Sequence, residues 1–169
     1  MSRSDPPSRR GLLASIGAGI ATAVAGCTGS DAIGGKPAYE DGTVGNLNTS
    51  NRSNRTASQM STAAALAQGE PSTTATPLDS LSLTSHQFVV EDGYLGSTIQ
   101  GTVENGGSNR VQIVEVRTRV YDDAGNQLGR YFASTGDLNA GSTWEFQVIV
   151  LESPSDVAEY DIAVLGTPS

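Results

Sequence analysis

The chain has 169 residues, with 18 acidic and 10 basic side chains and a formal net charge of −8. This length allows one ordinary domain and excludes two large ones. Residues 1–27 contain three arginines and one aspartate, so the remaining residues carry a net charge of −10, with Lys36 as their only lysine. Binding to nucleic acid or docking on anionic lipid requires clustered Lys and Arg, so this composition argues against both.

The scarcity of lysine and the excess of carboxylates are typical of proteins that work in concentrated salt. Carboxylates hold hydrated cations, and high salt screens their mutual repulsion. We therefore expect a halophilic protein, with an ordinary acidic domain as the alternative.

Residues 1–27 have the pattern of an export signal. Arg3, Arg9 and Arg10 form a positive segment, and the 14 positions from Leu12 to Ala25 are uncharged and mostly apolar. A membrane-spanning helix needs about 20 apolar residues, so a cleaved signal peptide is favoured over an uncleaved anchor helix.

Two motifs within this signal resemble those of exported lipoproteins. Residues 8–13, SRRGLL, resemble the twin-arginine (Tat) export motif, with Arg9 and Arg10 as the paired arginines. Residues 24–27, VAGC, resemble a lipobox, in which a peptidase cleaves before a cysteine that becomes lipidated. The resemblance implies export in a folded state and attachment to the outer side of the cell membrane through lipid on Cys27. An inert buried thiol is the alternative.

Residues 28–77 are rich in Ser, Thr, Gly, Asn and Ala and have few bulky apolar residues. Such a segment buries too little apolar surface to offset its chain entropy, so it is predicted to be a disordered tether. Within it, Met60 to Leu66 is the one stretch in which a short helix is expected. A flexible coil of this length has a reach of about 40 Å.

Three consecutive N-glycosylation acceptor sequences begin at Asn48, Asn51 and Asn54. Their clustering favours glycosylation of the tether. The alternative is a plain polar linker, because a segment rich in Asn, Ser and Thr produces such sequences by composition alone.

Residues 78–169 alternate between apolar and polar positions, with turns of Gly, Asn and Asp between the alternating segments. This two-residue period is that of half-buried strands. Short strands with frequent turns predict an all-β fold, an antiparallel β-sandwich of immunoglobulin-like size. The expected strands are 81–90, 95–104, 110–121, 127–133, 143–151 and 159–165.

Alternation along these strands also assigns faces. Trp144 and Phe146 are predicted to form the central core. Glu115, Arg117 and Arg119 share the opposite face of their strand from its valines, and we expect them to face solvent. They are either a recognition stripe or a solvated face with cross-strand ion pairs.

Four parts of the same region carry a further resemblance: residues 101–105, 116–122 with Gly125, 138–141 and Phe146. They resemble the FxLYD family of small exported β-sandwich domains, over about residues 95–165. Thr118 and Val120 stand where that family has Phe and Leu. The resemblance implies the fold, and no activity carries over from it.

The sequence predicts no enzyme, no cofactor and no metal site. His86 is the only histidine, and we expect it at the surface or at a sheet edge, because no nucleophile motif accompanies it. Acidic pairs at Glu91-Asp92 and at Asp122-Asp123, with Asn126, lie in predicted turns. Asp and Asn form turns by bonding their own backbone, and Ca²⁺ binding is the alternative.

These observations predict a non-catalytic, lipid-anchored cell-surface protein that interacts with another protein or with a cell-envelope component. The alternative is a lipoprotein that binds a small ligand or a cation as an accessory to a transporter.

Overall fold

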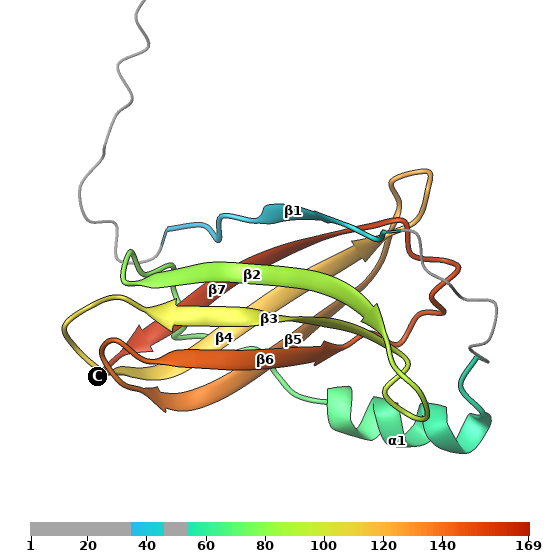
Figure 1. The fold of residues 1–169 in the computed structure, drawn as a ribbon, viewed down its shortest axis with the longest axis horizontal. Helices are drawn as coiled ribbons and strands as arrows, with labels where there is room; N and C mark the ends of the chain where they lie inside the picture. Colours follow the sequence, from blue (N-terminus) through green and yellow to red (C-terminus); the bar gives the residue numbers. More distant parts are fainter. Residues whose placement is uncertain (1–34, 46–53) are drawn as a thin grey trace, which may run out of the picture. The chain divides into compact units, whose positions relative to one another are not determined.

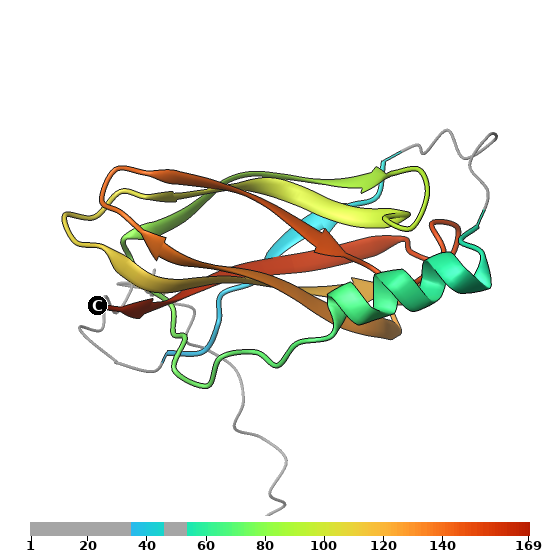
Figure 2. The same cartoon turned by 90° about the horizontal axis from the view of Figure 1, so that it is seen from below.

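The computed structural model describes residues 35–45 and 54–169, and these form two facing antiparallel sheets (Figure 1, Figure 2). One sheet has the strand order β1-β7-β4-β5 and the other has the order β2-β3-β6. The elements are β1 (Glu40–Thr43), α1 (Ala57–Ala67), β2 (Leu81–Val90), β3 (Ser97–Asn105), β4 (Val111–Tyr121), β5 (Gln127–Leu138), β6 (Thr143–Ile149) and β7 (Glu159–Pro168).

The predicted all-β antiparallel sandwich is confirmed, and each of the six strands expected in residues 78–169 is present. The largest differences are at strand ends. β5 continues to Leu138 and β7 to Pro168, because both pair with the start of β4 at Val111. Backbone pairing therefore extends these strands beyond their alternating sequence.

The core lies between the two sheets and consists mainly of β-branched residues. On β4, alternate side chains point inward, as the sequence predicts, and meet the inner face of β2-β3-β6. The completely buried apolar residues here are Ile99, Val103, Val114, Val116, Val120, Val148, Val150 and Ile162.

Phe146 and Trp144 do not share the central position predicted for them. Phe146 is 3% exposed and belongs to the core, whereas Trp144 is only partly buried and packs against the core. Both residues lie on the edge strand β6, but Trp144 is its second residue and Phe146 lies at its middle. The prediction was right about the face and wrong about the depth for Trp144, because alternation does not report how far a position lies from the end of its strand.

Two elements fall within the segment that was predicted to be a disordered tether. β1 pairs with β7 from Glu40↔Ile162 to Thr43↔Glu159 and forms one edge of its sheet. α1 contacts β6 and buries Ala63 completely. The prediction of disorder is wrong for these residues, because each gains its stability from the sandwich rather than from a core of its own. The short helix expected at Met60 to Leu66 is confirmed.

The segment 69–78 covers the outer face of the β1-β7-β4-β5 sheet. Thr76 forms an isolated antiparallel bridge with Gly166, with N–O distances of 2.9 and 2.8 Å. Ala75, Ala163 and Leu165 are buried together, and Tyr39 packs against them. Residues before the sandwich proper therefore bury a sheet face that would otherwise contact solvent.

The connections between strands gather at two ends of the sandwich. At one end, which we call the acidic pole, lie the connections 91–96, 122–126 and 152–158. They lie together because the strand residues next to them are paired: Val90 with Ser97, and Tyr121 with both Gln127 and Glu159. The C-terminal pole contains residues 105–110, 139–142 and 168–169, at the opposite strand ends.

Several sites predicted from the sequence lie outside the described residues. These are the export motif at Arg9 and Arg10, the lipidation site Cys27, and two sequons, those at Asn48 and Asn51. Asn54 is described, and its side chain is exposed. Within residues 35–45 and 54–169, no helix has both the length and the apolar character needed to cross a membrane.

Candidate functional site

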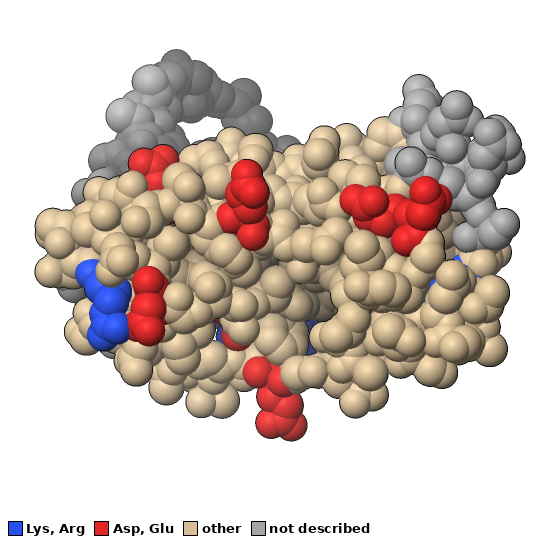
Figure 3. Space-filling model, turned by 60° about the horizontal axis from the view of Figure 1, so that its bottom comes forward, with Lys and Arg blue, Asp and Glu red and all other residues tan. Residues whose placement is uncertain are grey.

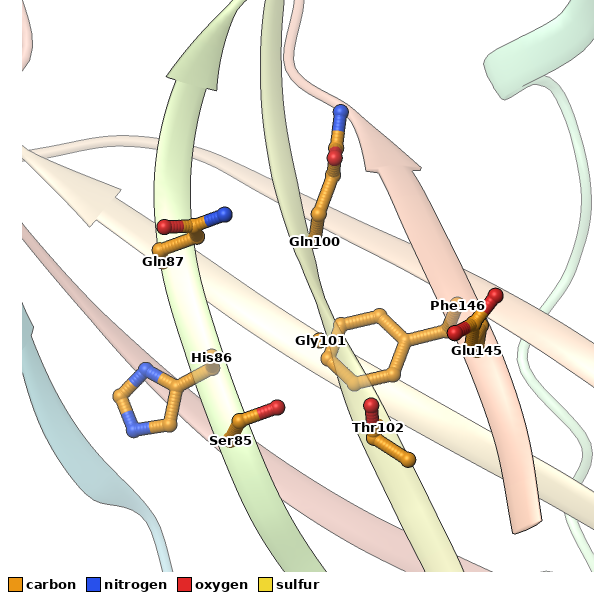
Figure 4. Close-up of a pocket in the computed structure, with 8 residues that line it drawn as sticks. All are labelled: Ser85, His86, Gln87, Gln100, Gly101, Thr102, Glu145 and Phe146. Atoms are coloured by element: carbon orange, nitrogen blue, oxygen red, sulfur yellow. The ribbon is translucent and has the colours of Figure 1, made fainter.

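The outer face of the β2-β3-β6 sheet contains an open depression of about 430 Å³ (Figure 4). All three strands contribute to it. Its lining residues are Ser85, His86, Gln87, Gln100, Gly101, Thr102, Glu145 and Phe146.

The backbone is closely packed at the centre of this depression. The pairing of β2 with β3 shifts register between Leu83 and Ser85. At Gly101, an added Cβ would lie 2.1 Å from the carbonyl oxygen of Ser85 and 2.7 Å from Cζ of Phe146. Glycine is therefore required here by close approach of a neighbouring strand and of a core ring.

The polar side chains of the depression lie in two rows across the sheet. Gln87 pairs with Gln100, and Ser85 pairs with Thr102, which in turn pairs with Glu145. Gln100 already donates to the Glu91 carboxylate at 2.8 Å. The rows present amides, hydroxyls and one exposed carboxylate, which are groups that recognise a polar partner through hydrogen bonds.

His86 lies on the edge strand β2, and its ring is directed away from Gln100 and Glu145 in Figure 4. Its Nδ1 lies 2.7 Å from the Tyr160 hydroxyl of the opposite sheet. Burial raises the pKa of Tyr160 to about 12, so this hydroxyl keeps its proton at neutral pH. The pair joins the two sheets, which gives His86 a structural role at the sheet edge.

The candidate recognition stripe on β4 is not exposed as the sequence predicts. Glu115 is 1% exposed, and its Oε2 accepts a hydrogen bond from Ser72 N at 2.8 Å. Arg117 forms an ion pair with Glu115 and donates to Ser72 O at 2.8 Å. Segment 69–78 of the same chain therefore forms hydrogen bonds with the side chains of Glu115 and Arg117. The prediction of solvent exposure is wrong for Glu115.

Arg119, the third residue of that stripe, is also engaged within the chain. Its Nε donates to Asp161 Oδ1 at 2.8 Å, and its guanidinium lies 3.8 Å from the ring centroid of Tyr39. Tyr121 donates to the same carboxylate at 3.0 Å. The hydrogen bonds that Arg119 donates to Asp161 raise the pKa of Arg119 above its ordinary value. This cluster fixes the arm that precedes β1 to the sheet.

The acidic turn at residues 122–126 shows the turn chemistry that the sequence predicts. Asp122 Oδ1 accepts hydrogen bonds from the backbone N of Ala124 at 3.0 Å and of Asn126 at 2.7 Å, and Oδ2 accepts from the Asn126 side chain at 2.9 Å. The Asn126 contacts hold the pKa of Asp122 below its ordinary value. Among the residues that the structure describes, no group of three or more His, Cys, Asp or Glu is arranged to hold a metal ion.

Arg55 attaches α1 to the acidic pole, and the sequence did not identify it. It donates to the carbonyls of Leu95 and Tyr94, the latter at 2.8 Å, and to Leu151 O at 3.3 Å. Burial lowers the pKa of Arg55. The adjacent Thr56 and Gln59 form a capping box, and this Thr-x-x-Gln pattern before an alanine-rich run is the signal that marks the helix start.

Comparison with known proteins gives one significant similarity. An uncharacterized protein of Methanocaldococcus jannaschii is 32% identical to this chain over 81 residues, which cover 47% of this chain and 59% of that protein. No model of a known protein family matches the chain, and no solved structure matches it. The similarity therefore relates the chain to an archaeal protein without assigning an activity to the depression.

Proposed function

We propose that this protein is a non-catalytic lipoprotein, held on the outer side of the cell membrane through Cys27, whose β-sandwich interacts with another protein or with a cell-envelope component. The observation that carries the proposal is the order of residues 8–27, in which paired arginines precede an uncharged apolar run that ends in the only cysteine. A two-chain lipid on that cysteine would give stable membrane attachment.

The two sheet faces support an interaction role for the domain. The outer face of β1-β7-β4-β5 is covered by residues 69–78 and by the arm before β1. The outer face of β2-β3-β6 keeps exposed polar side chains at Ser85, Gln87 and Glu145. This second face is the surface that we assign to the partner.

Cell fractionation tests the anchor. We expect the wild-type chain in the membrane fraction, Cys27→Ser released from it, and the double variant Arg9→Lys, Arg10→Lys retained inside the cell. A Cys27→Ser chain that stays in the membrane fraction would contradict lipid anchoring.

Cross-linking in intact cells at native salt tests the partner surface. Glu145→Lys reverses a charge on the exposed face and is expected to reduce recovery of the cross-linked partner. Glu70→Lys makes the same change at an exposed position after α1 and serves as the matched control. Equal recovery of the cross-linked partner with both variants would show that the interaction does not depend on the β2-β3-β6 face.

The depression itself favours a second candidate, the binding of a small polar ligand or a cation as an accessory to a transporter. Its amides and hydroxyls suit a polar solute. Thermal unfolding in the presence of Ca²⁺ or of a sugar, at constant ionic strength, tests this candidate, because a ligand that binds the native state raises the midpoint. The rise should disappear in Glu145→Gln.

A further inference from the structure

The four edge strands of the two sheets differ in how far they are protected against pairing with another chain. β1 has only four residues, and two of them are acidic. The pairing of β2 with β3 shifts register between Leu83 and Ser85. The pairing of β5 with β4 shifts register beside Tyr121, and β5 also contains Asp137 in the left-handed region, with φ of 56°. Short length, charge and irregular backbone are features by which edge strands resist the addition of a further strand.

The edge strand β6 lacks the short length and the irregular backbone of the other three edges. It pairs with β3 through all seven of its residues without a register shift. Its sequence, TWEFQVI, contains no proline, glycine or lysine, and Glu145 is its only charged residue. Thr, Trp, Phe, Val and Ile all favour strands. β6 is therefore a regular edge to which another strand can add.

The hydrogen bonds between β3 and β6 identify the backbone groups at this edge. Val150 N donates to Ser97 O at 2.9 Å, and Asn105 N donates to Ser142 O at 2.9 Å. Because residues along an antiparallel strand bond to their neighbour alternately, the even-numbered residues of β6 face β3. Among residues 35–45 and 54–169, no strand pairs with the other side of β6. The residues whose N–H and C=O groups face that side are Thr143, Glu145, Gln147 and Ile149.

Two side chains of β6 make the strand complementary to itself. Glu145 and Gln147 are both exposed. When two copies of β6 pair antiparallel about Phe146, Glu145 of each copy lies opposite Gln147 of the other. The Gln147 amide then donates to the Glu145 carboxylate at both places, and hydrogen bonds to an ionised group are the stronger ones. A register that set Glu145 opposite Glu145 would instead oppose like charges.

α1 borders this edge near the C-terminal end of β6 (Figure 2). A groove of about 310 Å³ separates Leu66 and Ala67 of α1 from Gln147 and Ile149. In the register about Phe146, Ile149 lies opposite Thr143 of the second copy. The residues before that threonine are the turn 139–142, whose side chains are those of Asn, Ala, Gly and Ser. Such a turn is small enough for the groove and would cover Leu66, which is 59% exposed.

The charge on this side of the molecule does not prevent two copies from meeting. Figure 3 is turned toward the side of β6 and β5, and its acidic side chains lie apart from one another within a mostly uncharged surface. The repulsion between two chains of net charge −8 is screened by salt, over about 8 Å at 0.15 M and about 3 Å at 1 M. Association should therefore strengthen as the salt concentration rises.

We propose that two copies of this chain associate through β6, antiparallel and in register about Phe146, so that their β2-β3-β6 sheets form one continuous sheet. The pairing is two-fold symmetric, because the same strand contributes from both copies. Contact between single edge strands buries less than about 1,200 Å², which is typical of weak and reversible complexes. The proposal goes beyond the proposed function and does not depend on lipid at Cys27. It joins the outer faces of the two β2-β3-β6 sheets into one wider surface.

Sedimentation of the full chain over a range of concentrations, at constant salt, tests the proposal. Cys27→Ser removes the only cysteine and serves as the parent. The parent should form a dimer that dissociates on dilution. Gln147→Glu sets carboxylates opposite one another at both places and should weaken dimerisation about tenfold. Gln87→Glu makes the same change at an exposed position on β2, the other edge of the sheet, and should leave dimerisation unchanged.

Exchanging the two side chains of the pair tests the register. A chain with both Glu145→Gln and Gln147→Glu again sets a carboxylate opposite an amide, so it should dimerise as the parent does. A parent that stays monomeric at every concentration would overturn the proposal. Equal effects of Gln147→Glu and Gln87→Glu, or no recovery in the double variant, would overturn it as well.

Disulfide formation provides an independent check of the register. A parent chain with Glu145→Cys is mixed with a parent chain with Gln147→Cys and oxidised mildly. In the proposed register these residues are directly opposed, with Cα atoms about 5.5 Å apart, a separation that a disulfide spans. The mixture should therefore cross-link faster than either variant alone. Faster cross-linking of one variant with itself would overturn the proposed pairing.

Discussion

The ring of Tyr160 lies against the backbone of Gly42, its partner across the β1–β7 ladder, and a Cβ added at Gly42 would lie 2.2 Å from Cζ of that ring. Gly42 is buried, and Tyr160 is 2% exposed. β1 therefore covers a core tyrosine, and a side chain at position 42 would occupy the space of the Tyr160 ring.

Replacing Gly42 by alanine is expected to destabilise the protein by about 1–3 kcal/mol, because overpacking forces the ring or the strand to shift. Urea unfolding followed by fluorescence measures the change. Gly45→Ala is the control, since its added Cβ meets no atom within 4 Å. Equal midpoints for the two variants would show that β1 does not pack on Tyr160.

Phe146 should contribute more to stability than Trp144, although Trp144 has the larger side chain. Phe146→Ala removes a buried ring and is expected to cost about 3–5 kcal/mol. Trp144→Ala should cost less, because its ring is only partly buried. Thermal unfolding of the two variants checks this order, and a larger loss for Trp144→Ala would contradict the observed depths.

Arg55 should hold α1 and the acidic pole together. Arg55→Met keeps an unbranched side chain and removes every donor to the carbonyls of Tyr94, Leu95 and Leu151. We expect a loss of about 1–3 kcal/mol and reduced hydrogen-exchange protection in residues 57–67. Arg130→Met changes an exposed arginine on β5 and should leave protection unchanged.

Tyr160 should lower the stability of the protein at alkaline pH. Burial raises its pKa from 10.0 to about 12, so the unfolded chain releases this proton first. The contribution of the protonated Tyr160 hydroxyl to the free energy of unfolding is fully present below pH 10 and is lost as the pH rises from 10 toward 12. The free energy of unfolding, measured across this range, should fall less steeply in Tyr160→Phe than in wild type.

In Tyr160→Phe the free energy of unfolding should still fall with rising pH in the alkaline range, because burial also raises the pKa of Tyr131. The matched control is Tyr94→Phe, which changes a tyrosine that is 42% exposed. If Tyr94→Phe flattened the slope as much as Tyr160→Phe, the buried tyrosine would not be the source of the effect.

The residues around Glu115 show why the sites were harder to predict than the strands. Alternation correctly placed Glu115 on the outer face of β4, but a pattern within one strand contains no information about what covers that face. The covering residue, Ser72, lies 43 positions earlier in the chain. The same limit applies to His86, whose partner Tyr160 is 74 positions away.

The tether prediction was wrong for the residues of β1 and α1 for a related reason. Composition measures whether a segment can bury a core of its own, and the residues near β1 and α1 cannot. They are ordered because Gly42 admits the Tyr160 ring and because Arg55 reaches carbonyls of the acidic pole. A local signal was present at Thr56, the first residue of the capping box, and it predicts a helix start without showing what the helix packs against.

By itself, the sequence determined the six strands of the sandwich, their inward faces and the turn at Asp122, because a two-residue period and Asp-Asn turn chemistry act over neighbouring residues. It also carries the export and lipidation motifs on which the proposed location depends. Only the tertiary structure decided that β1 completes a sheet, that Glu115 is buried and that Trp144 is only partly buried. Each of these outcomes depends on contacts between residues far apart in the chain, which no local pattern encodes.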